Sequence, residues 1–305
     1  MATSADQTGP EAASTATADV ASGASRTPTV TLRLWRGDGN GGSFNDYTVD
    51  NLGGEVVLDV VHRVQAEQAP DLAVRWNCKA GKCGSCSAEI NGRPRLMCMT
   101  RMSTLDTTQP ITVSPLRANP VIRDLVTDVS YNFAVARRIP AFHPGPRDAD
   151  GTYRMAQVDA DRVQEFRKCI ECFLCQNVCH VVRDHEENKP HFAGPRFFAR
   201  LAELEMHPLD TLDRRDLASR ELGIGYCNIT KCCTEVCPEG IHITDNAIIP
   251  MKERVVDARY DPIAWLGRKI LRRPAPTPAS STASLSPAGK AHETISTQPR
   301  TPAGG

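Results

Sequence analysis

Twelve cysteines limit what this chain can fold into more than any other feature, and all of them lie between Cys78 and Cys237 of the 305 residues. An even number of cysteines predicts disulfides in an exported protein. The first residues, MATSADQTGPEAAST, lack the basic and apolar segments of a signal peptide, and no stretch approaches the ~18 apolar residues of a membrane span. We therefore expect a chain that is neither exported by that route nor membrane-spanning. Clustered cysteines in a reducing compartment more often hold metal, so metal is favoured over disulfides.

Length and composition predict two domains and two terminal tails. At ~150 residues per domain the chain holds two domains, and 40% apolar residues can give each of them a core. Residues 1–27 are rich in Ala, Ser and Thr, and residues 274–305 in Pro, Ser, Thr and Ala, so both are expected to be disordered. The proline-containing connection IPAFHPGPRDADG suggests a boundary between domains at 28–140 and 141–273. The 36 basic and 36 acidic residues cancel, which argues against a nucleic-acid partner.

The apolar pattern of the first domain predicts a small mixed sheet packed on one helix. Alternating Val30, Leu32 and Leu34 indicate a half-buried strand, followed by a turn at 37–42 and a second strand around 47–49. One face of a helix is marked at i, i+3, i+4 and i+7 by Val57, Val60, Val61 and Val64. Further expected elements are a short strand at 74–76, a hairpin turning at Asn91-Gly92 and a last strand at 111–116.

From Val121 the apolar period changes to 3.6, which predicts an all-helical second half. Three helices are expected. The first is marked by Ile122, Leu125, Val126, Val129 and Phe133, and the second by Phe197, Leu201 and Leu204. The third extends through Arg254, with Thr244 as its N-cap. The fold class is therefore α+β.

The first group of cysteines is Cys78, Cys83, Cys86 and Cys98, with the C-x4-C-x2-C…C spacing of plant-type [2Fe-2S] ferredoxins. Such a loop wraps backbone N–H groups around sulfur, and Gly81 and Gly84 supply the positive φ that this requires. Lys79 and Lys82 either offset the charge of the cluster or are simply solvated. A zinc ribbon is the alternative, but zinc sites favour paired C-x2-C elements and this loop has one.

The second group is Cys169, Cys172, Cys175 and Cys179, the C-x2-C-x2-C-x3-C run in which the last cysteine of each run serves the other cluster of a pair. The matching run is CNITKCCTEVCP at 227–238, where Cys227, Cys233 and Cys237 fit the template and Thr230 replaces a ligand. A zinc-stabilised interaction module is the alternative from another class of function. It is disfavoured because this spacing is not a common zinc arrangement.

Counting ligands on that template gives three clusters. Cys169, Cys172, Cys175 and the returned Cys237 hold a [4Fe-4S] cluster, whereas three ligands are left for a [3Fe-4S] cluster, namely Cys179, Cys227 and Cys233. Cys232 is left over, either as a small buried residue or as a ligand to a fourth iron after a loop shift. His180 follows a ligand directly, so it is expected at the surface or beside the ligands rather than on iron. No phosphate loop, nucleophile or catalytic carboxylate pair stands out, so no catalytic residue is predicted.

These motifs together resemble the iron-sulfur subunit of succinate dehydrogenase and fumarate reductase over roughly Val30 to Tyr260. The segments RWNCKAGKCGSCSAEING, PVIRDLVTDVS, KCIECFLCQNVCHVVRDHEENK and CNITKCCTEVCPEGI are most similar to the actinobacterial branch of that family. The resemblance implies an N-terminal β-grasp plant-type ferredoxin domain followed by a helical domain like a bacterial ferredoxin.

The resemblance also implies a function. The subunit would pass electrons from the FAD of a partner flavoprotein, which oxidises succinate, through the [2Fe-2S], [4Fe-4S] and [3Fe-4S] clusters to quinone. The quinone, expected to be menaquinone, would be reduced beside the last cluster at a membrane anchor of one or more subunits. The resemblance therefore places the subunit in the tricarboxylic acid cycle and respiration, peripherally on the cytoplasmic face of the cell membrane. A fumarate reductase running in reverse, or a soluble adaptor for another flavoprotein, is the alternative.

This sequence departs from the family near the quinone. The family often has a tryptophan where this chain has Asp184 and a histidine where it has Asn228, and His180 replaces a proline. The quinone pocket is therefore the part that the resemblance fixes least.

The stretch YDPIAWLGRKILRRP suggests either a membrane-surface helix or an ordinary helix docked on its own domain. Ile263, Leu266 and Ile270 share a face, and Trp265 suits an interface. Its basic residues could meet anionic headgroups: Arg268, Lys269, Arg272 and Arg273.

Overall fold

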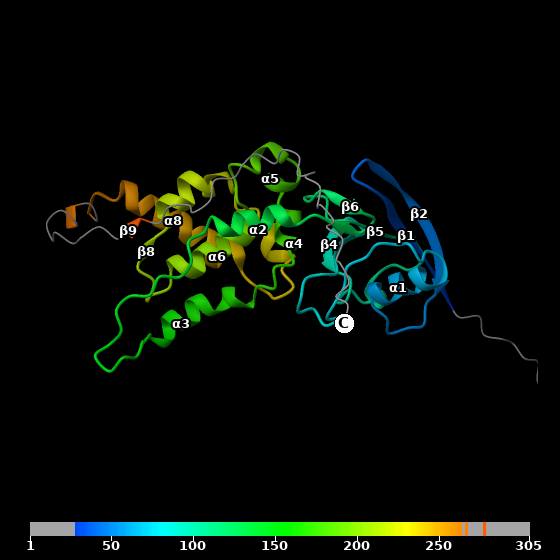
Figure 1. Ribbon diagram of the computed structural model, residues 1–305, viewed down its shortest axis with the longest axis horizontal. Helices are drawn as coiled ribbons and strands as arrows, with labels where there is room; N and C mark the ends of the chain where they lie inside the picture. The colour runs from blue at the N-terminus through cyan, green and yellow to red at the C-terminus, as the bar shows by residue number, and fades with distance from the viewer. Residues whose placement is uncertain (1–27, 264–265, 268–276, 279–305) are drawn as a thin grey trace, which may run out of the picture.

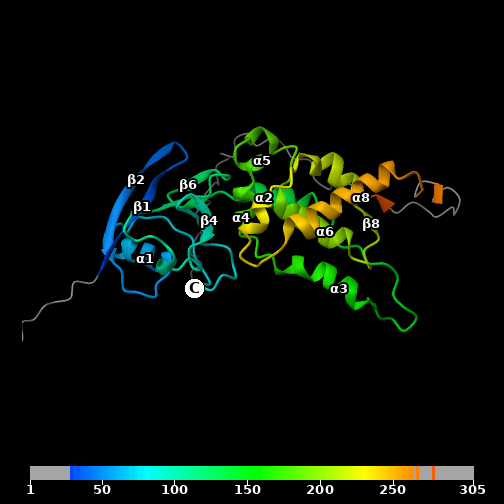
Figure 2. The same ribbon diagram turned by 180° about the vertical axis from the view of Figure 1, so that it is seen from behind.

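The computed structural model describes residues 28–263, 266–267 and 277–278. The two predicted tails lie outside the described residues, apart from 277–278. Figure 1 shows an elongated molecule with strands at one end and helices at the other, and Figure 2 shows the same two lobes from behind.

The first lobe is a seven-stranded mixed sheet in the order β4-β3-β5-β1-β6-β7, with β2 paired to β1. Its elements are β1 Thr29–Asp38, β2 Gly41–Asp50, α1 Val57–Glu67, β3 Ser87–Ile90, β4 Arg93–Leu96, β5 Ile111–Ser114, β6 Val121–Arg123 and β7 Val126–Thr127, with a 3-10 turn at Met102–Thr104. The predicted first hairpin is confirmed, and so is α1, which buries the predicted valine face. The β3–β4 hairpin turns at Asn91 and Gly92, which have φ of 50° and 72°.

Two expectations for this lobe are wrong, and Asp124 lies within or bonds beside both segments. The segment 74–76 is not a strand, and the helix expected from Ile122 is instead β6 and β7, with a helix beginning only at Ser130. Asp124 has a φ of 47°, and its buried carboxylate accepts hydrogen bonds from the backbone N–H groups of Gly37 and Ala73 at 3.0 and 2.8 Å. Apolar spacing could not reveal that a carboxylate binds these backbone groups.

The second lobe is predominantly helical, as predicted. Its elements are α2 Ser130–Arg137, α3 Gln157–Gln164, α4 Leu174–Val178, α5 His180–Arg183, α6 Pro195–Glu205, α7 Cys232–Glu235 and α8 Ile249–Tyr260, with a small β8 Leu212–Asp213 and β9 Thr277–Pro278 pair. There are 3-10 turns at Glu165–Lys168, Glu186–Asn188 and Ile224–Tyr226, and π-helical turns at Leu217–Glu221 and Ile243–Ile248. The expected helix at Phe197 is confirmed as α6.

Thr244 does not cap the last helix. It lies inside the π-helical turn that precedes α8, where its backbone N–H donates to the Thr234 hydroxyl at 3.0 Å. Its own hydroxyl lies 3.3 Å from the Cys233 sulfur. The Thr244 side chain is therefore engaged with the second cysteine run rather than with a helix terminus.

Each lobe has its own apolar core, and α4 joins them. Leu174 at the start of α4 is buried in the core of the first lobe, although the rest of α4 belongs to the second. The side chain of Asn177, which is fully buried, donates to Glu89 of β3 at 2.7 Å and accepts from the backbone N–H of Ala118 at 2.9 Å. The domain limits at 140/141 and at the tails stay predictions.

Replacing Asn177 with alanine should destabilise the contact between the lobes. The change leaves the buried Glu89 carboxylate and the Ala118 N–H each short of a partner, which costs about 2–4 kcal/mol. For a chain of this size we expect a melting temperature lower by roughly 5–10 °C, measured by loss of circular dichroism on heating. Asn45→Ala, at an exposed position of β2, is the control and should change little. An unchanged melting temperature for Asn177→Ala would contradict this role.

Candidate metal centres

The first site is the loop between Cys78 and Cys86 together with Cys98. Gly81 and Gly84 have φ of 69° and 70°, as predicted. The backbone N–H groups of Ala80 and Lys82 lie 3.4 and 3.3 Å from the Cys78 sulfur, which is the wrapped geometry that a cluster thiolate requires. Cys98 follows the β3–β4 hairpin, which returns the chain to the loop. The backbone N–H of Met97, next to Cys98, donates to the carbonyl of Cys86 at 3.0 Å, so the hairpin places Cys98 beside the loop cysteines.

Two sulfurs of this site have pKa values shifted in opposite directions. The Ser85 hydroxyl lowers the pKa of Cys83 to about 7, whereas burial raises the pKa of Cys86 to about 12. Cys86 also interacts electrostatically with Cys98 and Cys83. Four neighbouring thiolates repel one another unless cations lie between them. Two iron ions would supply that positive charge.

The second site is a small cavity that brings together four cysteines from both runs of the second lobe. Cys169, Cys172, Cys175 and Cys237 line it, which is the set that ligand counting predicted for [4Fe-4S]. Burial raises the pKa of Cys172 to about 12, and burial also raises the pKa of Cys175. Burial also raises the pKa of Cys169, but the Arg196 guanidinium opposes that rise.

The third site lies where Cys179 meets the second run. Cys179 interacts electrostatically with Cys232 and Cys233, and Cys233 interacts with Cys232 and Cys227. Burial raises the pKa of Cys179 to about 12. Cys179 and Cys233 are buried in the core of the second lobe, Cys227 packs against that core, and Cys232 directly precedes Cys233.

The backbone repeats between the two runs and distinguishes Thr230 from Cys232. In the first run Cys172 lies between two residues of positive φ, Glu171 at 55° and Phe173 at 58°. In the second run Thr230 lies between Ile229 at 63° and Lys231 at 62°. Thr230 thus occupies the position of Cys172.

Cys232 occupies the position of Leu174. Each is the first residue of a short helix, α4 or α7, and each precedes a cysteine of the template. Leu174 is buried in the first lobe, whereas Cys232 is half-buried, with its sulfur 3.3 Å from the Thr230 hydroxyl. The expectation of a fully buried Cys232 is therefore wrong, but its place in the repeat is not a ligand position.

The side chains flanking the cysteines have definite partners. Lys79 lies over the Trp76 ring at 4.8 Å, and Lys82, whose side chain is 70% exposed, pairs with Glu239 at 3.3 Å. Both lysines are exposed, as expected of solvated loop residues. His180 is half-buried, and its ring Nε2 lies 2.9 Å from the side-chain amide nitrogen of Asn228. Asp184 is exposed and pairs with its neighbour Arg183 at 2.7 Å.

The first and second sites adjoin directly. A Cβ at Gly84 would lie 2.7 Å from the Cα of Cys172, so only glycine allows the two loops to pack this closely. The Ser87 hydroxyl donates to the backbone carbonyl of Cys172 at 3.0 Å. Sequence reasoning found Gly84 but assigned it only a local role, and it missed Ser87 and Arg196, because neither stands at a fixed spacing from a cysteine.

Comparison with known proteins agrees with this geometry. Residues 31–134 match the family model of the 2Fe-2S iron-sulfur cluster binding domain, and residues 165–241 match that of the 4Fe-4S dicluster domain. The chain is 32% identical over 204 residues to a fumarate reductase iron-sulfur subunit of Mycobacterium tuberculosis, covering 65% of this chain and 81% of that one. It is 30% identical over 190 residues to the succinate dehydrogenase iron-sulfur subunit of Bacillus subtilis, covering 59% and 71%.

A solved structure decides the family. A chain of the Mycobacterium smegmatis Sdh1 complex in the apo form is 71% identical, with a TM-score of 0.75, and the match covers 78% of this chain and 99% of that one. The chain belongs to the succinate dehydrogenase and fumarate reductase iron-sulfur subunits. The predicted actinobacterial branch and two-domain ferredoxin fold are confirmed. It is an electron-transfer subunit of an oxidoreductase complex, with a 2Fe-2S and a 4Fe-4S domain.

Three structural findings bear on the remaining sequence-based expectations. All twelve cysteines are described, and none forms a disulfide. Within the described ranges no three His, Cys, Asp or Glu side chains converge closely enough to hold a single metal ion, whereas the thiolates of a cluster are shared among several irons. Among the same residues, no helix is both long and apolar enough to cross a membrane.

The repeat of the two runs predicts the effect of Thr230→Cys. The new thiol stands where Cys172 stands in the first run, so the three-iron signal should convert to a four-iron signal. Electron paramagnetic resonance (EPR) or Mössbauer spectra of anaerobically purified complex provide the measurement. Cys232→Ala is the matched control and should retain the three-iron signal. Failure of Thr230→Cys to convert the signal would count against this alignment of the runs.

Proposed function

We propose that this subunit passes electrons from the FAD of a partner flavoprotein to quinone in a succinate:quinone oxidoreductase. Three clusters would supply the one-electron redox chemistry when bound. The proposed ligands are Cys78, Cys83, Cys86 and Cys98 for [2Fe-2S], Cys169, Cys172, Cys175 and Cys237 for [4Fe-4S], and Cys179, Cys227 and Cys233 for [3Fe-4S]. The cavity lined by cysteines of both runs is the observation that carries the proposal.

The order of the sites supports a linear relay. The contact of Gly84 with Cys172 joins the first site to the second. The second and third sites share one run, because Cys175 lies within α4 and Cys179 directly follows it. The first proposed site therefore adjoins the second, and the second shares a run of sequence with the third.

The third site lies close to the surface, which supports quinone reduction there. The loop after Cys227 exposes Asn228, Ile229 and Thr230, and the side chain of Tyr226 before it is 50% exposed. Tyr226 and Ile229 are exposed apolar residues beside the proposed [3Fe-4S] site, and such residues suit contact with a membrane-anchor subunit. We propose that this surface meets the anchor and the quinone, for which menaquinone is our candidate, on the cytoplasmic face of the membrane.

The hydrogen bond between His180 and Asn228 connects two of the three positions that depart from the family pattern. The third of these positions is Asp184, whose carboxylate accepts a hydrogen bond from Arg183 instead. We propose that the quinone pocket of this branch is built around the His180 and Asn228 pair rather than around the tryptophan and histidine of other members.

The C-terminal membrane-surface helix stays a hypothesis. Ile263 and Leu266 are 82% and 49% exposed, but most of that stretch lies outside the described residues, namely Trp265, Arg268, Lys269, Ile270, Arg272 and Arg273. Fumarate reduction is the second candidate direction, favoured by the similarity to the Mycobacterium tuberculosis fumarate reductase subunit.

Anaerobic affinity purification of this chain from its native membranes tests the proposed function. We expect a brown complex that contains a flavoprotein and an anchor subunit and reduces dye with succinate. The chain purified alone should contain clusters but show no succinate activity, because its sequence predicts no flavin or substrate site. Colourless protein, or protein that contains only zinc, would refute the proposed clusters. Coloured protein without a flavoprotein partner would refute the proposed complex.

A further inference from the structure

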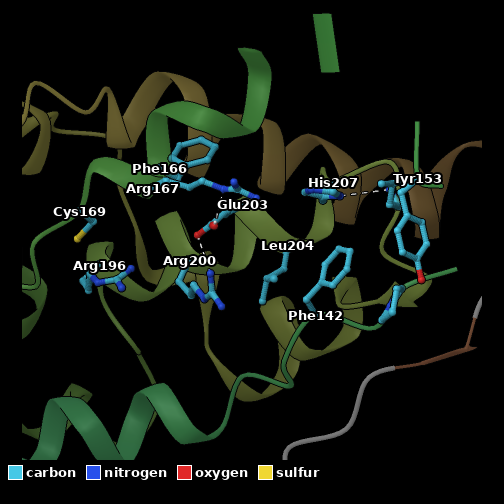
Figure 3. A pocket seen from close by; sticks show the side chains of 12 residues that line it. Phe142, Tyr153, Phe166, Arg167, Cys169, Arg196, Arg200, Glu203, Leu204 and His207 are labelled. Carbon is cyan, nitrogen blue, oxygen red and sulfur yellow. Dashed lines mark hydrogen bonds and ion pairs between the residues drawn. The ribbon is translucent and has the colours of Figure 1, made fainter. Parts of the chain in front are cut away.

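Arg196, the second residue of α6, separates two cavities. On one side it lines the small cavity with Cys169, Cys172, Cys175 and Cys237. On the other it lines a cleft of about 630 Å³ beside Phe142, Arg200 and His207. Figure 3 shows this cleft from close by, with the guanidinium group of Arg196 next to Cys169. The side chain is only 11% exposed, so its charge lies in the protein interior beside the cysteines.

The described residues leave one buried nitrogen of Arg196 without a hydrogen-bond partner. Its Nη2 donates to Glu171 at 2.7 Å. Its Nε is buried and has no hydrogen-bond partner among the described residues. A buried N–H without an acceptor is costly, so native proteins rarely leave one. Sulfur atoms are the acceptors that the adjoining cavity would offer.

We propose that Arg196 donates its Nε–H to the sulfur of the [4Fe-4S] cluster or of its thiolates and thereby raises the reduction potential of that cluster. The inference rests on the proposed ligand set for this cluster. Arg196 is thus a positioning and tuning residue, and it does not bind iron. Arg167 and Arg200 also line the cleft, but they do not line the cavity of the four cysteines, whereas Arg196 lines both.

The sign of the effect follows from charge. One-electron reduction adds one negative charge to the cluster, and a nearby cation with an N–H donor stabilises the more negative state. Glu171 reduces this effect, because it pairs with the same guanidinium, but its side chain is 45% exposed and therefore partly screened by water. Arg196 therefore favours the reduced cluster.

Redox titration of the complex purified from native membranes, followed by EPR, tests the proposal. In Arg196→Gln the ratio of reduced to oxidised [4Fe-4S] at the wild-type midpoint should fall about tenfold, which is about 59 mV for a one-electron couple. Arg196→Lys should restore most of the ratio, because it keeps the charge. The [2Fe-2S] and [3Fe-4S] midpoints of the same samples are internal references and should stay unchanged.

Arg200→Gln is the matched control. Arg200 lies one helical turn further along α6, lines the same cleft and pairs with Glu203 at 2.8 Å, but it does not line the cysteine cavity. It should leave the [4Fe-4S] midpoint unchanged. An unchanged midpoint in Arg196→Gln, or an equal fall in Arg200→Gln, would overturn the inference.

A second measurement needs no substitution. In wild-type complex labelled with ¹⁵N-arginine, pulsed EPR of the reduced [4Fe-4S] cluster should detect weak coupling to an arginine nitrogen. A [4Fe-4S] signal without such coupling would overturn the role of Arg196 alone. Absence of any [4Fe-4S] signal in wild-type complex would instead refute the proposed ligand set.

Discussion

The meeting of two distant cysteine runs at one small cavity is the constraint on which the rest of the structure depends. Cys237 can join Cys169, Cys172 and Cys175 only if residues 227–238 fold back onto residues 169–179. The two runs then share a backbone pattern, with positive φ on both sides of Cys172 and of Thr230. The helices α6 and α8 and the π-helical turn between α7 and α8 hold this arrangement, and Thr244 bonds directly to the second run.

The same cysteine loops form the contact between the lobes. Gly84 packs against Cys172, and Leu174 reaches into the core of the sheet lobe. The hydrogen bonds from Asn177 to Glu89 and from Ala118 to Asn177 add a buried polar connection a few residues away. The lobes touch where the proposed [2Fe-2S] and [4Fe-4S] ligands lie, and electron transfer between two clusters needs such a short distance. The contact that stabilises the lobes against each other would therefore also be the contact that electrons cross.

The surroundings of the second and third sites differ in a way that suits different tasks. The second site is a small cavity lined by one buried and three half-buried cysteines, beside an arginine side chain that is 11% exposed. A charge in such a place acts more strongly on a cluster than a charge at the surface. The third site lies beside exposed residues, Ile229 and Tyr226 among them, so a partner can reach it. Thr230, His180 and Asn228 all lie within a few residues of a proposed ligand of this site.

The sequence determined the elements with strong local periodicity, such as the β1–β2 hairpin, α1 and α6. It also predicted three sets of cysteines, because cluster chemistry fixes ligand spacing. It failed around Asp124, where a buried carboxylate accepts hydrogen bonds from distant backbone groups and β6 and β7 stand in place of an expected helix. It also failed at Thr244 and gave no sign of Arg196. Only the tertiary structure decided these, because a side chain that bonds to residues far along the chain leaves no periodic trace in its own neighbourhood.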